Sequence, residues 1–348
     1  MKKYILKIFK ILAITLLAIF LVIAFYIFFS GPQLPKNTDD MVNRAISSEL
    51  PEFIKGKADY IRNGELKIWY ESITPAEIKK GTILMFMGIS NDALGWPQSF
   101  LEKLVGAGYQ VIRYDYRGTG LSDWFEDWKD KPYSLSDLAS DSKIILDSLK
   151  IEKAHLVGVS MGGMVAQEFA LNFPGRTLSL TSIMSSGNII DEKLPPISKK
   201  VVLDLVRTGI KYGIIKNEKN QIKMQLAART ILKGNAEYDI DYKGISEQVL
   251  YNIRKRKGFN PRASAQHHEA TYRSGSRYEK LRNLKIPVLI IHGIKDPFIP
   301  VEHSKKLASV IPDSKTRWFN NMGHDFPPVL EDSIVFEIDM LIQTMGER

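Results

Sequence analysis

The sequence contains no cysteine among its 348 residues. Disulfide bonds, thiolate metal ligands and a cysteine nucleophile are therefore excluded, whereas a location outside the cytoplasm is permitted without being required. Internal repeats, low-complexity tracts and the glycine fingerprints of dinucleotide-binding or P-loop proteins are also absent. These absences argue against a repeat architecture and against nucleotide-dependent chemistry.

Acidic residues are fewer than basic ones, 39 against 48, and the formal net charge is +9. Four of the excess positive charges lie within the first ten residues, on Lys2, Lys3, Lys7 and Lys10, which leaves +5 on the rest of the chain. No recognisable nucleic-acid-binding module accompanies this modest excess, so no nucleic-acid partner is expected.

Residues 11–29 form a run of nineteen residues without a charge, fourteen of them Leu, Ile, Phe or Val. A helix of this length spans about 28 Å, close to the roughly 30 Å thickness of a bilayer's hydrocarbon core. Lysines precede the run and no acidic residue does, so the N-terminus is expected to stay in the cytoplasm. We predict a single-pass anchor in the cell membrane that tethers the rest of the chain outside the cytoplasm through residues 30–37.

A cleaved signal peptide, giving a secreted protein, is the alternative. The apolar run is long for a signal peptide, and residues 28–32 make a poor small-x-small cleavage site. The uncleaved anchor is therefore favoured.

Gly158, Ser160 and Gly162 form a G-x-S-x-G pentapeptide directly after the apolar run 154–157. A strand, a tight turn carrying a serine and a following helical segment describe a nucleophile elbow. Glycine is needed beside the serine because the turn is strained and a Cβ would collide with neighbouring backbone. The pattern predicts that Ser160 is a catalytic nucleophile.

An acid and a histidine follow in the order that such an enzyme requires. Asp296 comes after the buried-type strand 286–292, and His324 lies in a loop after the short strand 316–319. A serine hydroxyl needs an imidazole to take its proton, and a carboxylate holds that imidazole in the correct tautomer. We predict a Ser160–His324–Asp296 triad.

The oxyanion hole is expected to consist of backbone N–H groups. One is the amide of Met161, the residue after the nucleophile, and the other comes from the loop after the third strand. That strand covers residues 82–87, and by position in the following loop the second donor is Ile89.

Other polar residues near strand ends are interpreted as structural. His292 is expected to have a hydrogen-bonded structural role, His155 is expected to be structural too, and Asp115 and Arg117 are expected to brace a loop. Asp325 is expected at the loop surface or as a cap of the last helix.

The pair His267–His268 beside Glu269 suggests a metal site at first sight. Adjacent histidines on one helix point in different directions, and neither an HExxH pattern nor a cysteine partner is present. No metal ligand is therefore assigned.

Apolar strands alternate with helical patterns along most of the chain, which predicts an α/β fold: a mostly parallel central sheet with helices on both faces. Asn63–Gly64 is expected to form a type I′ hairpin turn near the start of that sheet. We divide the chain into a membrane anchor (1–30), a linker (31–57), a core in two pieces (58–185 and 285–348) and a helical cap (186–284).

Four helices are expected in the cap, at 197–213, 221–232, 245–257 and 263–274. This region is rich in lysine and arginine. Those residues form either a solvated helical face, which is favoured, or a surface for anionic lipid or anionic substrates.

The segments 87–88, 94–97, 112–122, 160–163, 274–277 and 323–327 are typical of one family. The chain resembles the α/β-hydrolases, and in particular the aclacinomycin methylesterase-like serine hydrolases, over roughly residues 58–345. The resemblance implies hydrolysis of a carboxylic ester through an acyl-enzyme, with no cofactor. Many relatives carry His-Gly where this chain has Met87–Gly88. Because the expected oxyanion donor is a backbone amide, this difference should affect the rigidity of the loop more than the chemistry.

Three hypotheses follow. The first is a membrane-tethered serine esterase that acts on small or lipid-like esters. The second retains the triad for lipase, thioesterase, amidase or cofactor-free perhydrolase chemistry. The third is a non-catalytic ligand-binding protein of the same fold. Dehalogenase and epoxide hydrolase activities are disfavoured because they need an aspartate at position 160.

Overall fold

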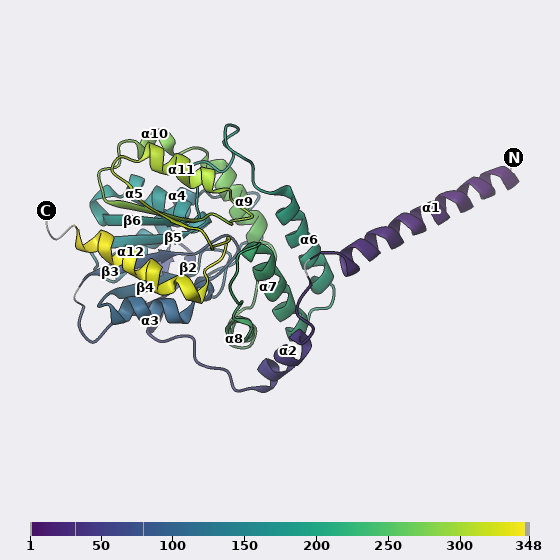
Figure 1. The fold of residues 1–348 in the computed structure, drawn as a ribbon, viewed down its shortest axis with the longest axis horizontal. Coiled ribbons are helices and arrows are strands. Elements are labelled where there is room, and N and C mark those ends of the chain that lie inside the picture. The colour runs from purple at the N-terminus through teal and green to yellow at the C-terminus, as the bar shows by residue number, and fades with distance from the viewer. Residues whose placement is uncertain (1, 32, 79, 345–348) are drawn as a thin grey trace.

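The computed structural model describes residues 2–31, 33–78 and 80–344. Met1, Pro32, Lys79 and residues 345–348 lie outside the described residues, although they fall within the predicted anchor, linker and core. Within the described part, the strands form one sheet in the order β1-β2-β4-β3-β5-β6-β7-β8 (Figure 1). The strands are β1 (Lys57–Asn63), β2 (Leu66–Ile73), β3 (Thr82–Phe86), β4 (Gln110–Tyr114), β5 (Ala154–Val159), β6 (Thr177–Ile183), β7 (Val288–Gly293) and β8 (Lys315–Phe319).

Strands β3 to β8 pair in parallel, and only β1 and β2 add antiparallel pairs at one edge. The prediction of a mostly parallel sheet is confirmed. Every residue of β3, β5 and β7 is buried, which explains why these segments are continuous apolar runs rather than alternating ones.

The hairpin between β1 and β2 is present, but its turn differs from the prediction. Asn63 pairs with Leu66, so the two loop residues are Gly64 and Glu65 rather than Asn63 and Gly64. Of these residues only Gly64 has a positive φ, +62°. Glycine at the first central position is typical of a type II′ turn, and the predicted type I′ turn is wrong.

Helices cover both faces of the sheet (Figure 1). On one face α3 (Gln98–Gly106) packs on β4 and α12 (Glu331–Gln343) packs on β7. On the other face α5 (Met161–Asn172) lies on β5 and β6, and it is flanked by α4 (Leu135–Ser148). The remaining short helices of the core are α10 (Tyr278–Leu281), α11 (Val301–Val310), η1 (Ala93–Gly95), η2 (Pro174–Arg176) and η3 (Pro328–Leu330).

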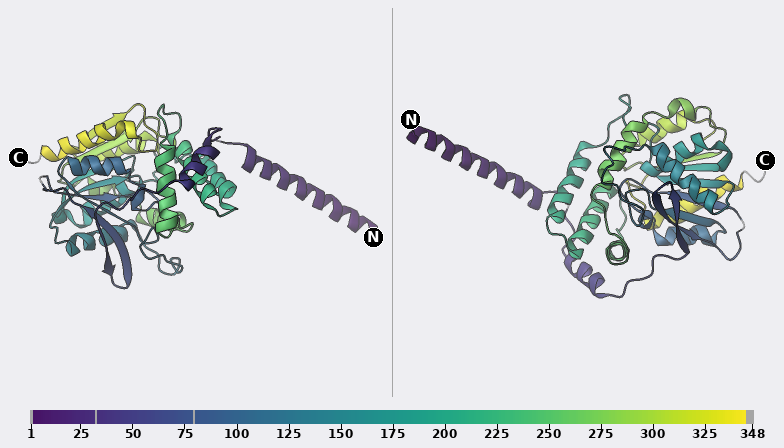
Figure 2. Two further views of the ribbon diagram at one scale, coloured as in Figure 1. Left: turned by 90° about the horizontal axis from the view of Figure 1, so that it is seen from below. Right: turned by 180° about the vertical axis from the view of Figure 1, so that it is seen from behind.

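Four helices between β6 and β7 form what we call the helical insertion. They are α6 (Lys199–Gly213), α7 (Glu218–Lys233), α8 (Tyr242–Lys255) and α9 (Ala263–Ser274), close to the predicted positions. They lie beside the sheet on its α1 side in Figure 1 and in both views of Figure 2.

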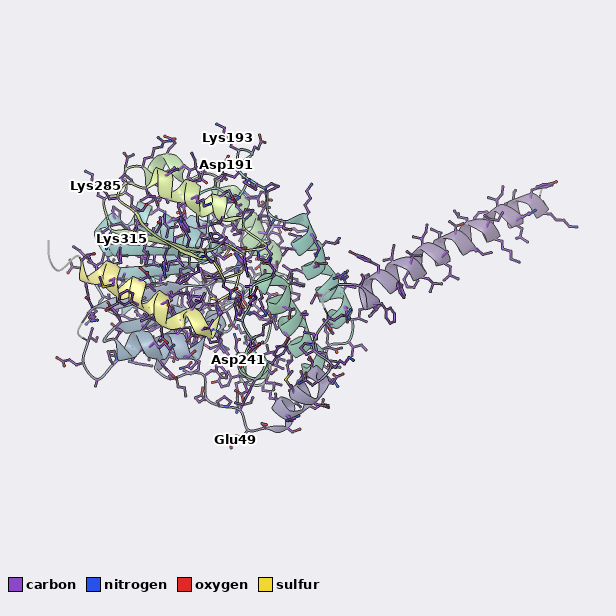
Figure 3. All side chains as sticks on the ribbon, viewed as in Figure 1. Glu49, Asp191, Lys193, Asp241, Lys285 and Lys315 are labelled. Carbon is purple, nitrogen blue, oxygen red and sulfur yellow. The ribbon has the colours of Figure 1, made fainter. Side chains whose placement is uncertain are left out.

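Many basic side chains of the insertion are held in ion pairs. Lys219 and Lys223 contact Asp39, and Arg254 contacts Glu218. By contrast, charged residues at the periphery of the core, such as Lys285, project into solvent (Figure 3). Some basic residues of the insertion are therefore neutralised by ion pairs, either within the insertion or with α2.

Helix α1 (Lys2–Phe29) extends away from the rest of the molecule (Figures 1 and 2). Residues 3–29 have a mean hydropathy of 3.0 in their most apolar window, and none of that window is buried. The helix is long and apolar enough to cross a membrane.

The predicted linker contains a helix, α2 (Thr38–Ser47). Its buried Val42 joins a cluster with Ile222, Leu226 and Leu250 of the insertion. The segment after α1 is therefore packed against the insertion rather than being a free tether.

Candidate active site

Ser160 lies at the junction of β5 and α5, where the chain makes a strained turn. Its backbone has φ +56° and ψ −123°, which is rare for a residue with a side chain. A Cβ on Gly162 would lie 2.0 Å from the carbonyl oxygen of Phe86, and one on Gly158 would lie 2.3 Å from that of Gly162. These contacts explain both glycines of the pentapeptide, since neither position can accept a side chain.

The structure brings the three predicted triad residues together. His324 Nε2 lies 3.0 Å from Ser160 Oγ, and His324 Nδ1 lies 2.7 Å from Asp296 Oδ2. All three side chains are buried, although they come from loops 28 to 164 residues apart in sequence. Both distances are within hydrogen-bonding range, so a proton can pass from the hydroxyl to the imidazole.

Asp296 is oriented by main-chain donors. Its Oδ1 accepts hydrogen bonds from the amides of Phe298 and Ile299, at 2.8 and 2.9 Å. Burial by itself would raise the pKa of this carboxyl group. The charge of His324 and hydrogen bonds from His292 and His324 outweigh burial and hold the pKa of Asp296 below its ordinary value. The group is therefore ionised at neutral pH, as an imidazole-orienting carboxylate must be.

A cavity of about 890 Å³ opens onto Ser160 and His324. One wall consists of the loop after β3, including Gly88 and Ile89, and the opposite wall consists of α6 and α7 of the insertion. Most of the lining side chains are apolar, which suits a substrate with a hydrocarbon part.

The predicted oxyanion donors belong to segments that adjoin Ser160. Met161 is the first residue of α5, so its amide has no acceptor within the helix. An ideal Cβ on Gly88 would lie 3.5 Å from the Cβ of Ser160, so the loop that carries Ile89 begins in contact with the serine.

Comparison with known proteins identifies the fold. Residues 81–328 match the profile of the alpha/beta hydrolase fold. The rhodomycin D methylesterase DnrP of Streptomyces peucetius is 28% identical over 294 residues, which cover 80% of this chain and 95% of that enzyme. The chain belongs to the α/β-hydrolase fold family. It is a hydrolase, and the predicted fold class and family are confirmed.

Solved structures agree with this assignment of the fold. The esterase RhEst1 from Rhodococcus sp. ECU1013 superposes with a TM-score of 0.62 at 22% identity, covering 83% of this chain and 98% of that one. A bacterial membrane phospholipase A superposes with a TM-score of 0.62 at 17% identity, covering 100% of both chains. At these identities the likeness concerns the fold alone.

Several residues of the hydrolase's site were not predicted. His267 of α9 is buried, and its Nδ1 accepts a hydrogen bond from the amide of Ser90 at 3.1 Å. Burial lowers the pKa of His267 to about 4, so the ring is neutral and can accept. Ser90 follows Ile89 and has a φ of +61°, so this contact holds the loop in a conformation that is costly for a non-glycine residue.

Asp325 is neither a loop-surface residue nor a helix cap, and that expectation is wrong. It is buried and forms an ion pair with Arg229 of α7 at 3.1 Å. The insertion thus contacts the residue next to His324.

His292 has more contact with the site than expected. Its Nδ1 bonds Ser304 Oγ at 2.6 Å, which is the predicted structural role, but its Nε2 also lies 3.1 Å from Asp296 Oδ2. His155 bonds Ser179 Oγ at 2.8 Å, within the core. The four-residue spacing from His292 to Asp296 is the only local signal for their contact.

The predicted bracing residues are placed in buried ion pairs. Arg117 binds Asp141, with its Nη2 2.6 Å from Oδ1. Asp115 accepts from the amides of Ala93 and Leu121 and forms an ion pair with Arg256, which follows α8. Burial raises the pKa of Asp115 to about 6 even though Arg256 opposes the shift.

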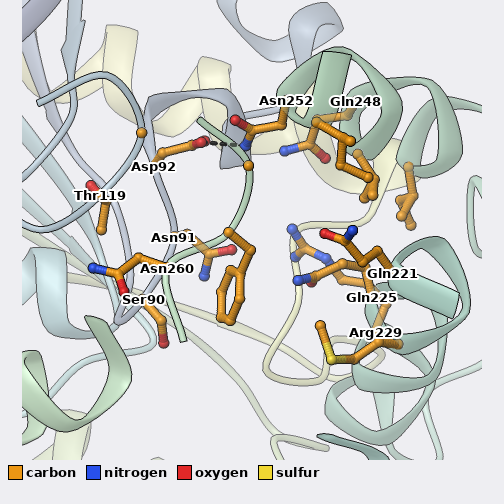
Figure 4. Close-up of a pocket in the computed structure, with 17 residues that line it drawn as sticks. Ser90, Asn91, Asp92, Thr119, Gln221, Gln225, Arg229, Gln248, Asn252 and Asn260 are labelled. Carbon is orange, nitrogen blue, oxygen red and sulfur yellow. Dashed lines mark hydrogen bonds between the residues drawn. The ribbon is translucent and has the colours of Figure 1, made fainter. Parts of the chain in front are cut away.

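A smaller polar cavity of about 50 Å³ lies next to this network (Figure 4). Ser90, Asn91 and Asp92 line one side, and Gln225 and Gln248 line the other. Asn252 of α8 donates to Asp92 across it, so α8 and the loop after β3 are fastened together (Figure 4).

Proposed function

We propose that the hydrolase is a membrane-tethered serine esterase that cleaves carboxylic esters through an acyl-enzyme. The observation that carries the proposal is the continuous chain of hydrogen bonds from Asp296 through His324 to Ser160, with distances of 2.7 and 3.0 Å. The methylesterase relatives support an ester as the substrate.

In the first half of the reaction, Ser160 Oγ attacks the ester carbonyl carbon while His324 Nε2 takes its proton. The carbonyl oxygen becomes an oxyanion, which the amides of Ile89 and Met161 stabilise. The tetrahedral intermediate collapses, His324 protonates the leaving alcohol, and the acyl group remains on Ser160.

In the second half, His324 takes a proton from a water molecule, which attacks the acyl carbon. The new tetrahedral intermediate expels Ser160 Oγ, which recovers its proton from His324, and the carboxylic acid is released. Asp296 stays ionised throughout and stabilises the imidazolium that forms in both halves.

We propose further that α1 spans the membrane, with the N-terminus in the cytoplasm and the α/β core outside. The exposed apolar surface of residues 3–29 and the lysines that precede residue 11 support this orientation. In intact cells, protease added from outside should digest the core. A soluble product that lacks α1 would contradict the tether.

The esterase is tested with purified full-length protein and nitrophenyl esters of graded chain length. Ser160→Ala should lower kcat by about 10⁴-fold or more, because the nucleophile is lost, while the thermal unfolding temperature changes little. Ser309→Ala, which removes an exposed hydroxyl on α11, is the matched control and should leave kcat unchanged. Substantial activity in Ser160→Ala would refute the triad. Failure of the parent protein to react with a fluorophosphonate would favour a non-catalytic binding protein.

A further inference from the structure

Helix α6 carries a stripe of exposed apolar side chains. Leu203, Val206 and Ile210 are 51%, 54% and 44% exposed, and Ile214 and Ile215, directly after the helix, are 64% and 63% exposed. Residues three, four and seven positions apart share a helix face, so Leu203, Ile210 and Ile214 form one continuous patch. Five large apolar side chains in so short a segment exceed the scattered exposure expected of a soluble surface.

The patch lies on the face of α6 against which α1 ends. Arg207 is four residues after Leu203 and three before Ile210, so it shares their face. Its Nη1 donates to Ser30 Oγ at 3.1 Å, and its guanidinium lies over the Tyr26 ring at 5.2 Å. The patch therefore surrounds the point at which the membrane-spanning candidate leaves the folded part of the chain (Figures 1 and 2).

Gly31 fixes this junction. Its φ is +91°, and an ideal Cβ there would lie 1.3 Å from Arg207 Nη2. The positive φ favours glycine where the chain leaves α1, and a side chain there would have to displace the Arg207 guanidinium, so α1 ends at a defined contact with α6.

The opposite face of α6 lines the large cavity. Leu205, Gly209 and Tyr212 follow the same spacing of four and three residues, about half a turn away from the exposed patch, and all three belong to the cavity wall. Val202 and Val206 belong to the cavity wall and are also exposed, at 42% and 54%. The cavity thus reaches the surface along the edge of α6 that borders the patch.

We infer that α6 lies in the interfacial zone of the bilayer that α1 enters, and that the cavity behind it takes its ester substrates from that bilayer. The inference rests on the proposed tether and esterase activity. Lys199 and Lys200 precede the patch along α6 and Lys211 follows Ile210, and an apolar stripe bordered by lysines has the composition of an interfacial helix. The substrates are then long-chain, lipid-like esters, whose hydrocarbon part matches the apolar cavity wall.

The position of α6 is tested by labelling, because the chain has no cysteine of its own. The full-length variants Ile214→Cys and Leu203→Cys are each labelled with an environment-sensitive fluorophore. They are then reconstituted in phosphatidylcholine–phosphatidylglycerol vesicles. Nitroxide lipids should quench both labels. Leu17→Cys in α1 is the positive control, and Phe336→Cys on α12, an equally exposed apolar site at 61%, is the negative control.

Quenching at residue 17 without quenching at residues 203 and 214 would overturn the inference while leaving the tether intact. An apolar environment at residue 214 that nitroxide lipids do not quench would indicate a second copy of the chain and would also overturn it. Absence of quenching at residue 17 would refute the tether and the inference together.

Activity gives a second readout. Leu203→Ser combined with Ile210→Ser changes two residues outside the cavity wall. The double variant should hydrolyse a long-chain nitrophenyl ester embedded in vesicles at least about 10-fold more slowly, because the interfacial contact is weakened. It should hydrolyse soluble nitrophenyl acetate at the parental rate, and Phe336→Ser should change neither. Equal rates of the double variant and the parent on the embedded ester would contradict delivery from the bilayer.

Discussion

The backbone amide of His324 donates a hydrogen bond to the carbonyl oxygen of Leu232 at 2.8 Å. Leu232 lies in the last turn of α7, where the carbonyl oxygens accept no hydrogen bond from the helix itself. An insertion helix therefore ends on the loop that carries the proposed catalytic base. A movement of α7 would therefore move the imidazole of His324.

Gly323→Ala tests this coupling. An ideal Cβ at residue 323 would lie 2.4 Å from the carbonyl oxygen of Lys233, so the loop must shift away from α7. A shift of about 1 Å at a reacting group can lower kcat about 10²-fold, and we expect a loss of that order in steady-state assays. Gly175→Ala, where a Cβ meets no atom within 4 Å, is the control. Parental kcat in Gly323→Ala would show that α7 does not position His324.

His267 is predicted to support the oxyanion loop. His267→Ala removes the acceptor of the part-buried Ser90 amide, and losing such a hydrogen bond typically costs about 0.5–1.5 kcal/mol. The loop that carries Ile89 is then less firmly held. We expect kcat to fall by at least about 10-fold with little change in KM, because the amide of Ile89 acts mainly on the transition state. His267→Asn, which retains an acceptor near the Nδ1 position, should recover part of the loss. Equal kcat values for the two variants would argue against this role.

The buried pair of Asp115 and Arg256 is predicted to stabilise the contact between core and insertion. Arg256→Met leaves Asp115 buried without its cation, and breaking such a pair typically costs about 3–5 kcal/mol in the free energy of unfolding. Adding Asp115→Asn removes the uncompensated charge and should restore part of that free energy. Denaturant unfolding of the two variants measures the difference. If the second substitution adds to the loss instead, the charge of Asp115 is not the cause.

Acid is predicted to destabilise the fold through buried neutral histidines. Burial lowers the pKa of His155 to about 4, whereas an unfolded histidine has a pKa of about 6.5. Between these values the unfolded chain binds the proton and the folded chain does not, so stability is complete above about pH 6.5 and is lost as the pH falls towards 4. The full loss from this residue is about 3 kcal/mol. His155→Asn, which can still bond Ser179, should flatten the decline measured by unfolding at pH 7, 5.5 and 4.

Much of the fold follows from local pattern. Continuous apolar runs such as 288–291 identify the buried parallel strands, because a strand covered on both faces has no polar side. The order Ser160, Asp296, His324 was sufficient to identify residues that the fold brings together. Strand ends meet at one edge of a parallel sheet, so sequence order and strand assignment determine their convergence.

The contacts that hold the site in place could not be predicted, because they join segments far apart in sequence. Ser90 and His267 are 177 residues apart, and Arg229 and Asp325 are 96 apart. Their residue types are common on any surface, and only the packing of the insertion makes them partners. The helix α2 did leave a signal: Asp39 and Asp40 in its first turn and buried Val42 and Ala45 three residues apart are typical of a short amphipathic helix.

Because α2 packs on the insertion, the folded unit begins before the first strand of the sheet. Val42 fills a space between α7 and α8, against Ile222, Leu226 and Leu250. A shortened chain that begins at residue 58, where the sheet starts, would leave that space open to water and would expose apolar side chains of the insertion. A shortened chain that begins at residue 33 loses the anchor and keeps this packing, including Leu34, which also lies against the cluster.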